Sequence, residues 1–283
     1  MRLALRRARD ATGLSQGAVA DRMGWSMSKV QRIEAGDNAI SGTDLRALLD
    51  FYGITDPEEI EQLQEEARIS RRQRWWTKPE YRENLTPPML QLVQFEAQAA
   101  EIRSYFPTIL PGIFQTDAYA EQILGAFSAV LTEDERRVRL DFRARRREAV
   151  LDSTDGARHY VILDESVIQR EIGGIAVMAD QLDLLADIAR HPNVYLRIIP
   201  LREGAVLGSG GHFLVMDIVE EDFEDSMLYR ESFTEDSLSH QAKEVAFLRA
   251  MFETAWSRSL DEEKTVRAIL AEAAGLRARI DRA

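Results

Sequence analysis

The sequence predicts a mainly α-helical protein of the α+β class, in which five N-terminal helices precede a domain built around a small mixed sheet. Apolar residues recur at helical spacing up to about residue 67, and four short segments rich in β-branched and aromatic residues occur only after residue 158. The chain of 283 residues also exceeds the usual length of one domain. We therefore expect two domains, at residues 1–70 and 89–283, joined by a linker at residues 71–88.

The N-terminal helices are delimited by residues that typically begin and end helices. The first is expected over residues 2–12, and Gly13 ends it because glycine adopts the left-handed conformation at low cost. Ser15 and Ser26 are the expected N-caps of the second and third helices, and Gly24 between them lets the chain reverse tightly. The residues of these two helices that should face the core are Val19, Ala20, Met23, Val30 and Ile33. Two further helices are expected over residues 41–52 and 57–67.

The third helix has an outward face whose side chains suit a DNA groove. Because Val30 and Ile33 face inward, the opposite side of this helix faces outward. Amide groups pair with adenine, cationic groups with guanine or phosphate, hydroxyls with several bases, and apolar groups with the thymine methyl. The start of the second helix suits a phosphate, because the helix dipole and a polar side chain meet there. The candidate DNA-binding residues are Gln16, Met27, Ser28, Lys29, Gln31 and Arg32. The alternative is an ordinary helical hairpin packed in a core.

Several positions of this region agree with one known type of domain. They are Leu14-Ser15-Gln16, Val19-Ala20, Met23-Gly24, Ser26, Val30, Arg32-Ile33-Glu34 and Gly36. In these residues the chain resembles the helix-turn-helix of the Cro/repressor or xenobiotic-response-element (XRE) type, a lambda-repressor-like domain. The resemblance covers about residues 3–67 and implies a protein that binds double-stranded DNA, which we expect to be a homodimer. We expect Glu34 to form a structural ion pair with Arg6 or Arg9 rather than a contact with DNA.

Charge is distributed unevenly along the chain. The formal net charge is −12, whereas residues 1–36 contain seven Lys or Arg residues and three acidic ones, which gives +4. The 201 residues after Arg82 carry −13. Phosphate contacts depend on charges within the Debye length of about 8 to 10 Å, so an acidic protein with a basic N-terminal segment can still bind DNA.

The remainder of the chain alternates between helical and strand patterns. Helices are expected at residues 89–105, 116–127, 133–151, 166–172 and 175–190, and in the two segments Val245 to Trp256 and Val266 to Ile280. Strands are expected at residues 159–165, 193–200, 211–219 and 226–232. This order predicts a small mixed sheet covered by helices. The arginine run at residues 143–147 covers more than one side of its helix, so we expect salt bridges to the acidic body rather than a DNA surface.

The second domain also resembles a known group. The residues that carry the resemblance are Leu110-Pro111-Gly112-Ile113-Phe114-Gln115-Thr116, Tyr119-Ala120, Leu163-Asp164-Glu165, Gly173-Gly174, Val177-Met178, Gln181-Leu182, Asn193-Val194, Ile199-Pro200 and Gly211-His212-Phe213. Over about residues 90–255 the chain is similar to the C-terminal domain of actinobacterial helix-turn-helix regulators, some of them antitoxin-like. This resemblance implies a transcription factor whose partner is often a small acidic protein encoded nearby. Members usually have more chain before the first helix, so we expect the protein to begin upstream of Met1.

Composition and spacing argue against several other classes. The absence of Cys excludes disulfides, thiolate zinc sites and cysteine nucleophiles, and it fits a cytoplasmic location. We expect no membrane segment, because the chain has no apolar signal core and no window of about 18 uncharged apolar residues. The four His residues lack metal-binding spacing, and neither a metal nor another cofactor is expected. Asp164-Glu165 fits either an acid pair or the cap of the helix that follows.

Three functions of different classes are compatible with these observations. The leading one is a sequence-specific regulator, in which residues 1–70 bind DNA while residues 85–283 dimerise and receive a signal from a partner protein or a small molecule. The second is an antitoxin-like protein that neutralises a small partner and binds DNA for autoregulation. The third is an enzyme fused to a helix-turn-helix, whose structural sign would be a buried polar pocket around Asp164, His212 and Tyr229. We expect no enzymatic activity.

Overall fold

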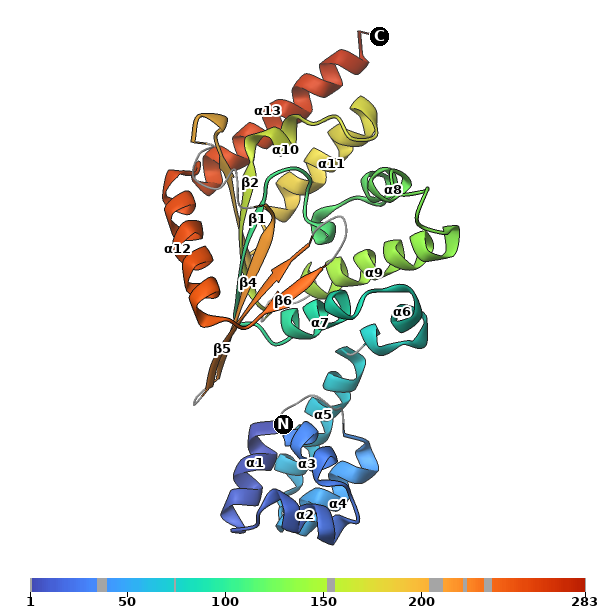
Figure 1. The fold of residues 1–283 in the computed structure, drawn as a ribbon, viewed down its shortest axis with the longest axis vertical. Coiled ribbons are helices and arrows are strands. Elements are labelled where there is room, and N and C mark those ends of the chain that lie inside the picture. The colour runs from blue at the N-terminus through green and yellow to red at the C-terminus, as the bar shows by residue number, and fades with distance from the viewer. Residues whose placement is uncertain are drawn as a thin grey trace. The chain divides into compact units, whose positions relative to one another are not determined.

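The chain forms two compact units, Met1–Trp75 and Trp76–Ala283 (Figure 1). The structure is a computed structural model, and it describes residues 2–34, 40–73, 75–151, 156–203, 211–220, 223–231 and 236–282. Gly36, which belongs to the repressor-like pattern, lies outside these ranges.

The first unit is the expected helical domain. Its helices are α1 (Arg2–Ala11), α2 (Gln16–Met23), α3 (Met27–Glu34), α4 (Gly42–Tyr52) and α5 (Pro57–Gln73). The side chains at the centre of its core, each at most 2% exposed, are Leu5, Val19, Ala20, Val30, Ile33, Ile40, Leu45, Leu48, Leu49 and Ala67. The small side chain of Ala20 is among them, as a close packing of α2 on α3 requires.

Local signals delimit α2 and α3 as the sequence predicted. The Ser15 hydroxyl accepts a hydrogen bond from the Ala18 amide at 3.2 Å, and the Ser26 hydroxyl accepts one from the Lys29 amide at 3.2 Å. These bonds satisfy amides that have no partner within their own helix. Gly24 has φ +66°, the left-handed conformation that a tight turn between two helices requires.

The second unit is built on a six-stranded mixed sheet. Its strands are β1 (Glu101–Phe106), β2 (Arg158–Asp164), β3 (Val194–Ile199), β4 (Phe213–Glu220), β5 (Phe223–Arg230) and β6 (Ser237–Ser239), in the order β3-β2-β1-β4-β5-β6. The first three are parallel to one another, with Glu101 paired to Arg158 and His159 to Val194. The remaining neighbours are antiparallel.

Helices cover both faces of this sheet (Figure 1). On one face, α12 (Ala242–Arg258) packs against inward residues of β1, β2, β4 and β5. The other face carries the larger core and the helices α7 (Pro87–Glu96), α8 (Asp117–Gly125), α9 (Glu133–Leu151), α10 (Glu165–Gln169), α11 (Gly174–Ile188) and α13 (Glu262–Ile280). Short 3₁₀ turns lie at Trp75–Thr77, Gly112–Phe114 and Leu201–Glu203, and the turn at Gly112–Phe114 is η2. The α+β class is therefore confirmed.

Three expectations about elements need correction. The fifth helix, expected over residues 57–67, continues to Gln73. The helix expected over residues 89–105 ends at Glu96, and Glu101–Phe106 is β1, in the interior of the sheet. This segment is extended because its backbone pairs with β2 on one side and β4 on the other. The local sequence pattern does not indicate these pairings. Strand β6 was not predicted, because three residues are too few to show an alternation of apolar and polar side chains.

The stretch expected to be a linker, residues 71–88, contains a short helix, α6 (Pro79–Asn84). Tyr81 of α6 is fully buried, and its ring meets that of Phe142 in α9 at 5.3 Å between centroids. Its hydroxyl also donates to the carboxylate of Asp141. Residues 79–84 are thus anchored in the second unit.

Candidate DNA interface and a pocket in the second unit

The outward face of α3 is exposed as the helix geometry predicts. Met27 is 54% exposed, and Ser28 and Gln31 are also exposed. Val30 and Ile33, on the other side of the helix, are each 2% exposed. The side chains available to a groove are therefore set by the packing of the apolar ones.

Glu34 holds the first three helices together. Its carboxylate accepts a hydrogen bond from Arg9 Nε at 2.7 Å and another from Gln16 Nε2 at 2.8 Å. Arg9 also donates from Nη1 to the Leu14 carbonyl at 2.8 Å, and its pKa is raised, chiefly by the hydrogen bond to Glu34. The expected structural ion pair of Glu34 is confirmed, with Arg9 as its partner. The Gln16 side chain, predicted to reach a phosphate, donates to Glu34, and its contact with DNA stays a prediction.

Lys29 has two partners within its own unit. Its ammonium lies 2.9 Å from the Asp44 carboxylate and 3.9 Å from the centroid of the Trp25 ring. A contact between Lys29 and DNA would have to compete with both interactions. Arg32 belongs to α3, and its side chain lies outside what the structure describes.

Most arginines of the run at residues 143–147 in α9 form ion pairs with carboxylates, as expected. The ion pairs are Arg145–Asp141 at 3.1 Å, Arg146–Glu96 at 2.5 Å and Arg147–Asp117 at 3.3 Å. Arg143 instead donates to the side-chain oxygen of Gln115 at 3.1 Å. Burial lowers the pKa of Arg143 to about 10.

Asp164 is a helix cap. Its carboxylate accepts from the Ser166 amide at 3.0 Å and from the Ser166 hydroxyl at 2.6 Å, at the start of α10. The Glu165 carboxylate accepts from the Leu201 amide at 2.8 Å. Of the two interpretations of this acidic pair, the cap is confirmed for Asp164.

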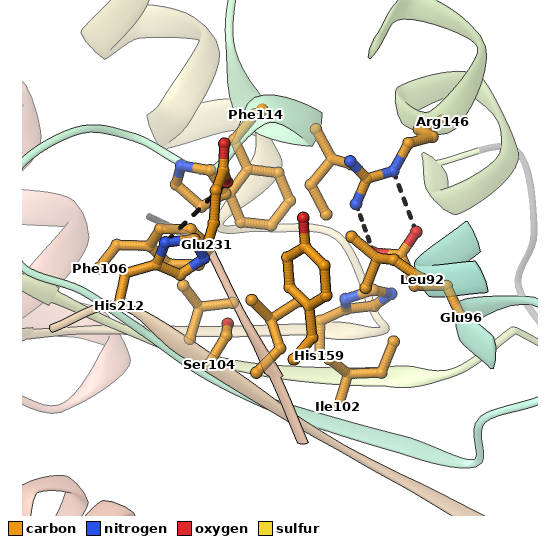
Figure 2. Close-up of a pocket in the computed structure, with 16 residues that line it drawn as sticks. Leu92, Glu96, Ile102, Ser104, Phe106, Phe114, Arg146, His159, His212 and Glu231 are labelled. Carbon is orange, nitrogen blue, oxygen red and sulfur yellow. Dashed lines mark hydrogen bonds and ion pairs between the residues drawn. The ribbon is translucent and has the colours of Figure 1, made fainter. Parts of the chain in front are cut away.

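A cavity of about 50 Å³ lies on the face of the sheet that carries the larger core. Its walls come from α7, β1, η2, α9, β2, β4 and β5 and the residues next to them, and they include Leu92, Glu96, Ile102, Ser104, Phe106, Ile113, Phe114, Arg146, His159, Val161, His212, Leu214, Tyr229 and Glu231. Figure 2 shows Arg146 and Glu96 together at one end, with Phe106, His212 and Glu231 at the other. The pocket therefore has charged groups at both ends, and the rest of its lining is mostly apolar, with Ser104, His159 and Tyr229 as further polar members.

Arg146 and Glu96 form an ion pair with two hydrogen bonds at their end of the pocket (Figure 2). Arg146 donates from Nε at 3.0 Å and from Nη2 at 2.5 Å to the two carboxylate oxygens. Their side chains are only 12% and 9% exposed. Burial opposes the charge on Arg146, but the nearby Glu96 carboxylate outweighs it, so the pKa of Arg146 is raised.

The two histidines of the pocket are uncharged near neutral pH. Burial lowers the pKa of His159 and of His212 to about 4. The His212 ring stacks on Phe106 at 4.8 Å between centroids. The approach of 4.0 Å between His212 and Glu231 is therefore not an ion pair at neutral pH.

Tyr229 contributes a buried hydroxyl that interacts with Asp236. The residue is 1% exposed. The Asp236 carboxylate interacts with this hydroxyl, and the interaction opposes the rise that burial causes in the pKa of Asp236. Burial, reinforced by Glu231 and Asp236, raises the pKa of Tyr229, so it remains a donor.

Comparison with known proteins finds one matching family model in each unit. Residues 1–63 match a helix-turn-helix domain, and residues 89–271, more than half of the chain, match a domain of unknown function, DUF5753. The chain belongs to the DUF5753 family. No curated protein and no solved structure matches it. The helix-turn-helix match supports a DNA-binding regulator.

The pocket lies entirely within the matched part of the DUF5753 domain. The sequence singled out His212 and Tyr229 as members of a possible polar pocket, and both line it, whereas Asp164 does not. The Arg146–Glu96 pair and the neutral His159 were not foreseen as members. The available signal was weak, since it consisted of polar residues, such as Ser104 and His159, at buried strand positions.

Across the residues that the structure describes, no three His, Asp or Glu side chains are grouped so that they could hold a metal ion. No helix within these ranges is long and apolar enough to cross a membrane.

Proposed function

We propose that this protein is a dimeric, sequence-specific transcriptional regulator of the XRE type, whose DUF5753 unit receives a signal from a partner protein or a small ligand. The observation that supports the proposal most directly is the exposed face of α3, which presents Met27, Ser28 and Gln31 beside a fully packed core. The formal charge of +4 on residues 1–36 favours the approach of this face to phosphate.

Each residue of the face has a distinct role in this proposal. Gln31 pairs with an adenine edge, Arg32 with guanine or phosphate, and the Met27 side chain contacts a thymine methyl. The Ser28 hydroxyl forms a hydrogen bond with the edge of a base, without a preference for one base. Gln16 and Lys29 contribute at the backbone of the DNA only if they exchange Glu34 and Asp44 for phosphate.

The test begins with selection of a preferred duplex from random DNA by the full-length protein. In gel-shift competition, Gln31→Ala and Arg32→Ala should each lose about 1 to 3 kcal/mol of preference for that site, with a smaller loss of nonspecific binding. Gln64→Ala, the same change at an exposed position of α5, is the matched control and should keep full preference. Full discrimination by both α3 variants would show that this helix does not read the groove.

The dimer is tested on the same duplex. Two recognition helices should lie about 34 Å apart, one turn of DNA, so the selected site should be close to a palindrome. Light scattering should give two chains per duplex. A monomer both free and on DNA contradicts this part of the proposal.

We also propose that the DUF5753 unit binds rather than catalyses. A histidine with a pKa of about 4 is too weak a base to serve near neutral pH, and this holds for both His159 and His212. The Arg146 guanidinium is already occupied by Glu96. Turnover abolished by replacing either histidine would contradict this assignment.

The antitoxin-like function is the second candidate. Besides the resemblance over residues 90–255, its support is the exposed apolar side chain of Phe247 on α12, which is 63% exposed and suits a protein partner. Co-purification of a small protein in near-stoichiometric amount from the native host is expected in that case. Isolation of the free chain with full DNA-binding activity would argue against it.

A further inference from the structure

Lys29, at the edge of the outward face of α3, is held by two side chains of its own unit. Its Nζ lies 2.9 Å from Oδ2 of Asp44 in α4 and 3.9 Å from the centroid of the Trp25 ring, which lies between α2 and α3. A lysine side chain loses much rotamer freedom when its ammonium is fixed, so one exposed contact seldom holds it in place. Two contacts from different segments of the chain give Lys29 a defined position.

The carboxylate of Asp44 is a cost to any DNA complex of this unit. It carries a negative charge beside the face of α3 that is proposed to meet phosphate, and like charges across an interface repel one another. The local structure of α4 does not depend on it, because the hydrogen bond at the start of this helix runs from the Asp44 backbone amide to the Ser41 hydroxyl at 3.0 Å. Its contact with Lys29 is therefore the effect that the charge itself produces.

Phosphate can compete with Asp44 for the Lys29 ammonium. Both side chains of the pair are 34% exposed, and ion pairs that water reaches contribute little net stability. A lysine binds phosphate as a point charge, and each such contact releases counterions from the DNA. Any phosphate contact that Lys29 makes must first replace the contact with Asp44, which lowers the gain from binding DNA through its phosphates alone.

We propose that Asp44 is a positioning residue that sharpens sequence preference: it holds Lys29 away from the phosphate backbone and so limits non-specific DNA binding. This inference rests on the proposed function. Non-specific binding comes essentially from phosphate contacts, whereas sequence is read at the edges of the bases. With Lys29 restrained, the uncharged exposed side chains of Met27, Ser28 and Gln31 determine a larger part of the binding.

The experiment measures the affinity of the full-length protein for a duplex of unrelated sequence at several salt concentrations, by fluorescence anisotropy. Asp44→Asn keeps the size of the side chain and removes its charge. It should raise the non-specific affinity about threefold to tenfold at about 50 mM salt, and it should steepen the slope of log affinity against log salt by about 0.9, the value of one added phosphate contact. Asp44→Ser, a second uncharged residue that suits the start of a helix, should give the same slope. An unchanged slope in both variants overturns the proposal.

Two comparisons separate the restraint of Lys29 from the general effect of removing a negative charge. In a Lys29→Gln background, Asp44→Asn should raise the non-specific affinity less than about twofold, because no ammonium is left to release. Asp50→Asn is the matched control: it removes the same charge from the same helix and breaks an ion pair with Arg46 at 3.2 Å, and it should leave the slope unchanged. An equal rise with and without Lys29, or an equal change of slope in Asp50→Asn, would reduce the effect to the overall electrostatic field and contradict the proposal.

The duplex that the wild-type protein selects separates this inference from the proposed function. Asp44→Asn should raise the affinity for that duplex less than for the unrelated one, because base contacts fix the register and Lys29 cannot move to the nearest phosphate. Equal gains on the two duplexes would show that Asp44 does not act on sequence preference. A steeper slope in a protein that selects no duplex supports the restraint of Lys29 and contradicts sequence-specific regulation. A selected duplex with no change of slope does the opposite.

Discussion

Replacing Glu34 with Ala should destabilise the N-terminal unit by about 3 kcal/mol, because truncating one partner of a buried charge pair costs about 3 to 5 kcal/mol. The lower end applies here, since Arg9 keeps a second carboxylate, Asp10, at 2.8 Å. The Gln16 amide also loses its acceptor, although it can turn to water. In a unit of 75 residues, such a loss corresponds to about 15 °C in melting temperature.

Hydrogen exchange on the full-length protein is the suitable assay, because it reports the N-terminal unit separately from the second one. In Glu34→Ala, the amides of α1, α2 and α3 should lose protection together, while those of the sheet keep theirs. Glu61→Ala, at an exposed position of α5, is the control and should change neither unit. Unchanged protection of α2 and α3 in Glu34→Ala would refute the assignment of Glu34 as the residue that joins these helices.

Two other predictions concern stability. His159 and His212 have native pKa values of about 4 against 6.5 for a free histidine, so the unfolded chain binds more protons between these values. The free energy of unfolding of the second unit should therefore fall as pH is lowered from about 6.5 to about 4. The fall should be up to about 1.4 kcal/mol per pH unit for each histidine. In urea unfolding measured at several pH values, His212→Gln should reduce this slope. Gly24→Ala should cost about 1 kcal/mol because φ is +66°, whereas Gly17→Ala in α2 should gain about 0.5 kcal/mol, and thermal melts of both variants compare these effects directly.

The helix-turn-helix was predictable because its signals are local. Ser15, Gly24 and Ser26 act on amides and turns within three residues of themselves, so their roles follow from the sequence alone. The apolar spacing of Val30 and Ile33 likewise determines which side of α3 is exposed.

Strand β1 was missed because its conformation depends on distant partners. Residues 101–106 follow α7 closely and continue its apolar content, but Glu101 pairs with Arg158 in β2 and with Asp217 in β4. More than fifty residues separate β1 from each of these partner strands in the sequence, so a local pattern carries no information about the pairing.

The sequence by itself determined the boundaries of α2 and α3, the outward face of α3 and the pairing of most α9 arginines with carboxylates, because each depends on nearby residues or on overall charge. Tertiary structure alone decided that Gln16 bonds to Glu34 and Lys29 to Asp44, and it brought Tyr229, His212 and Arg146 around one cavity. Those contacts join residues far apart in the chain, and the packing of α9 and η2 on the sheet determines which of them meet.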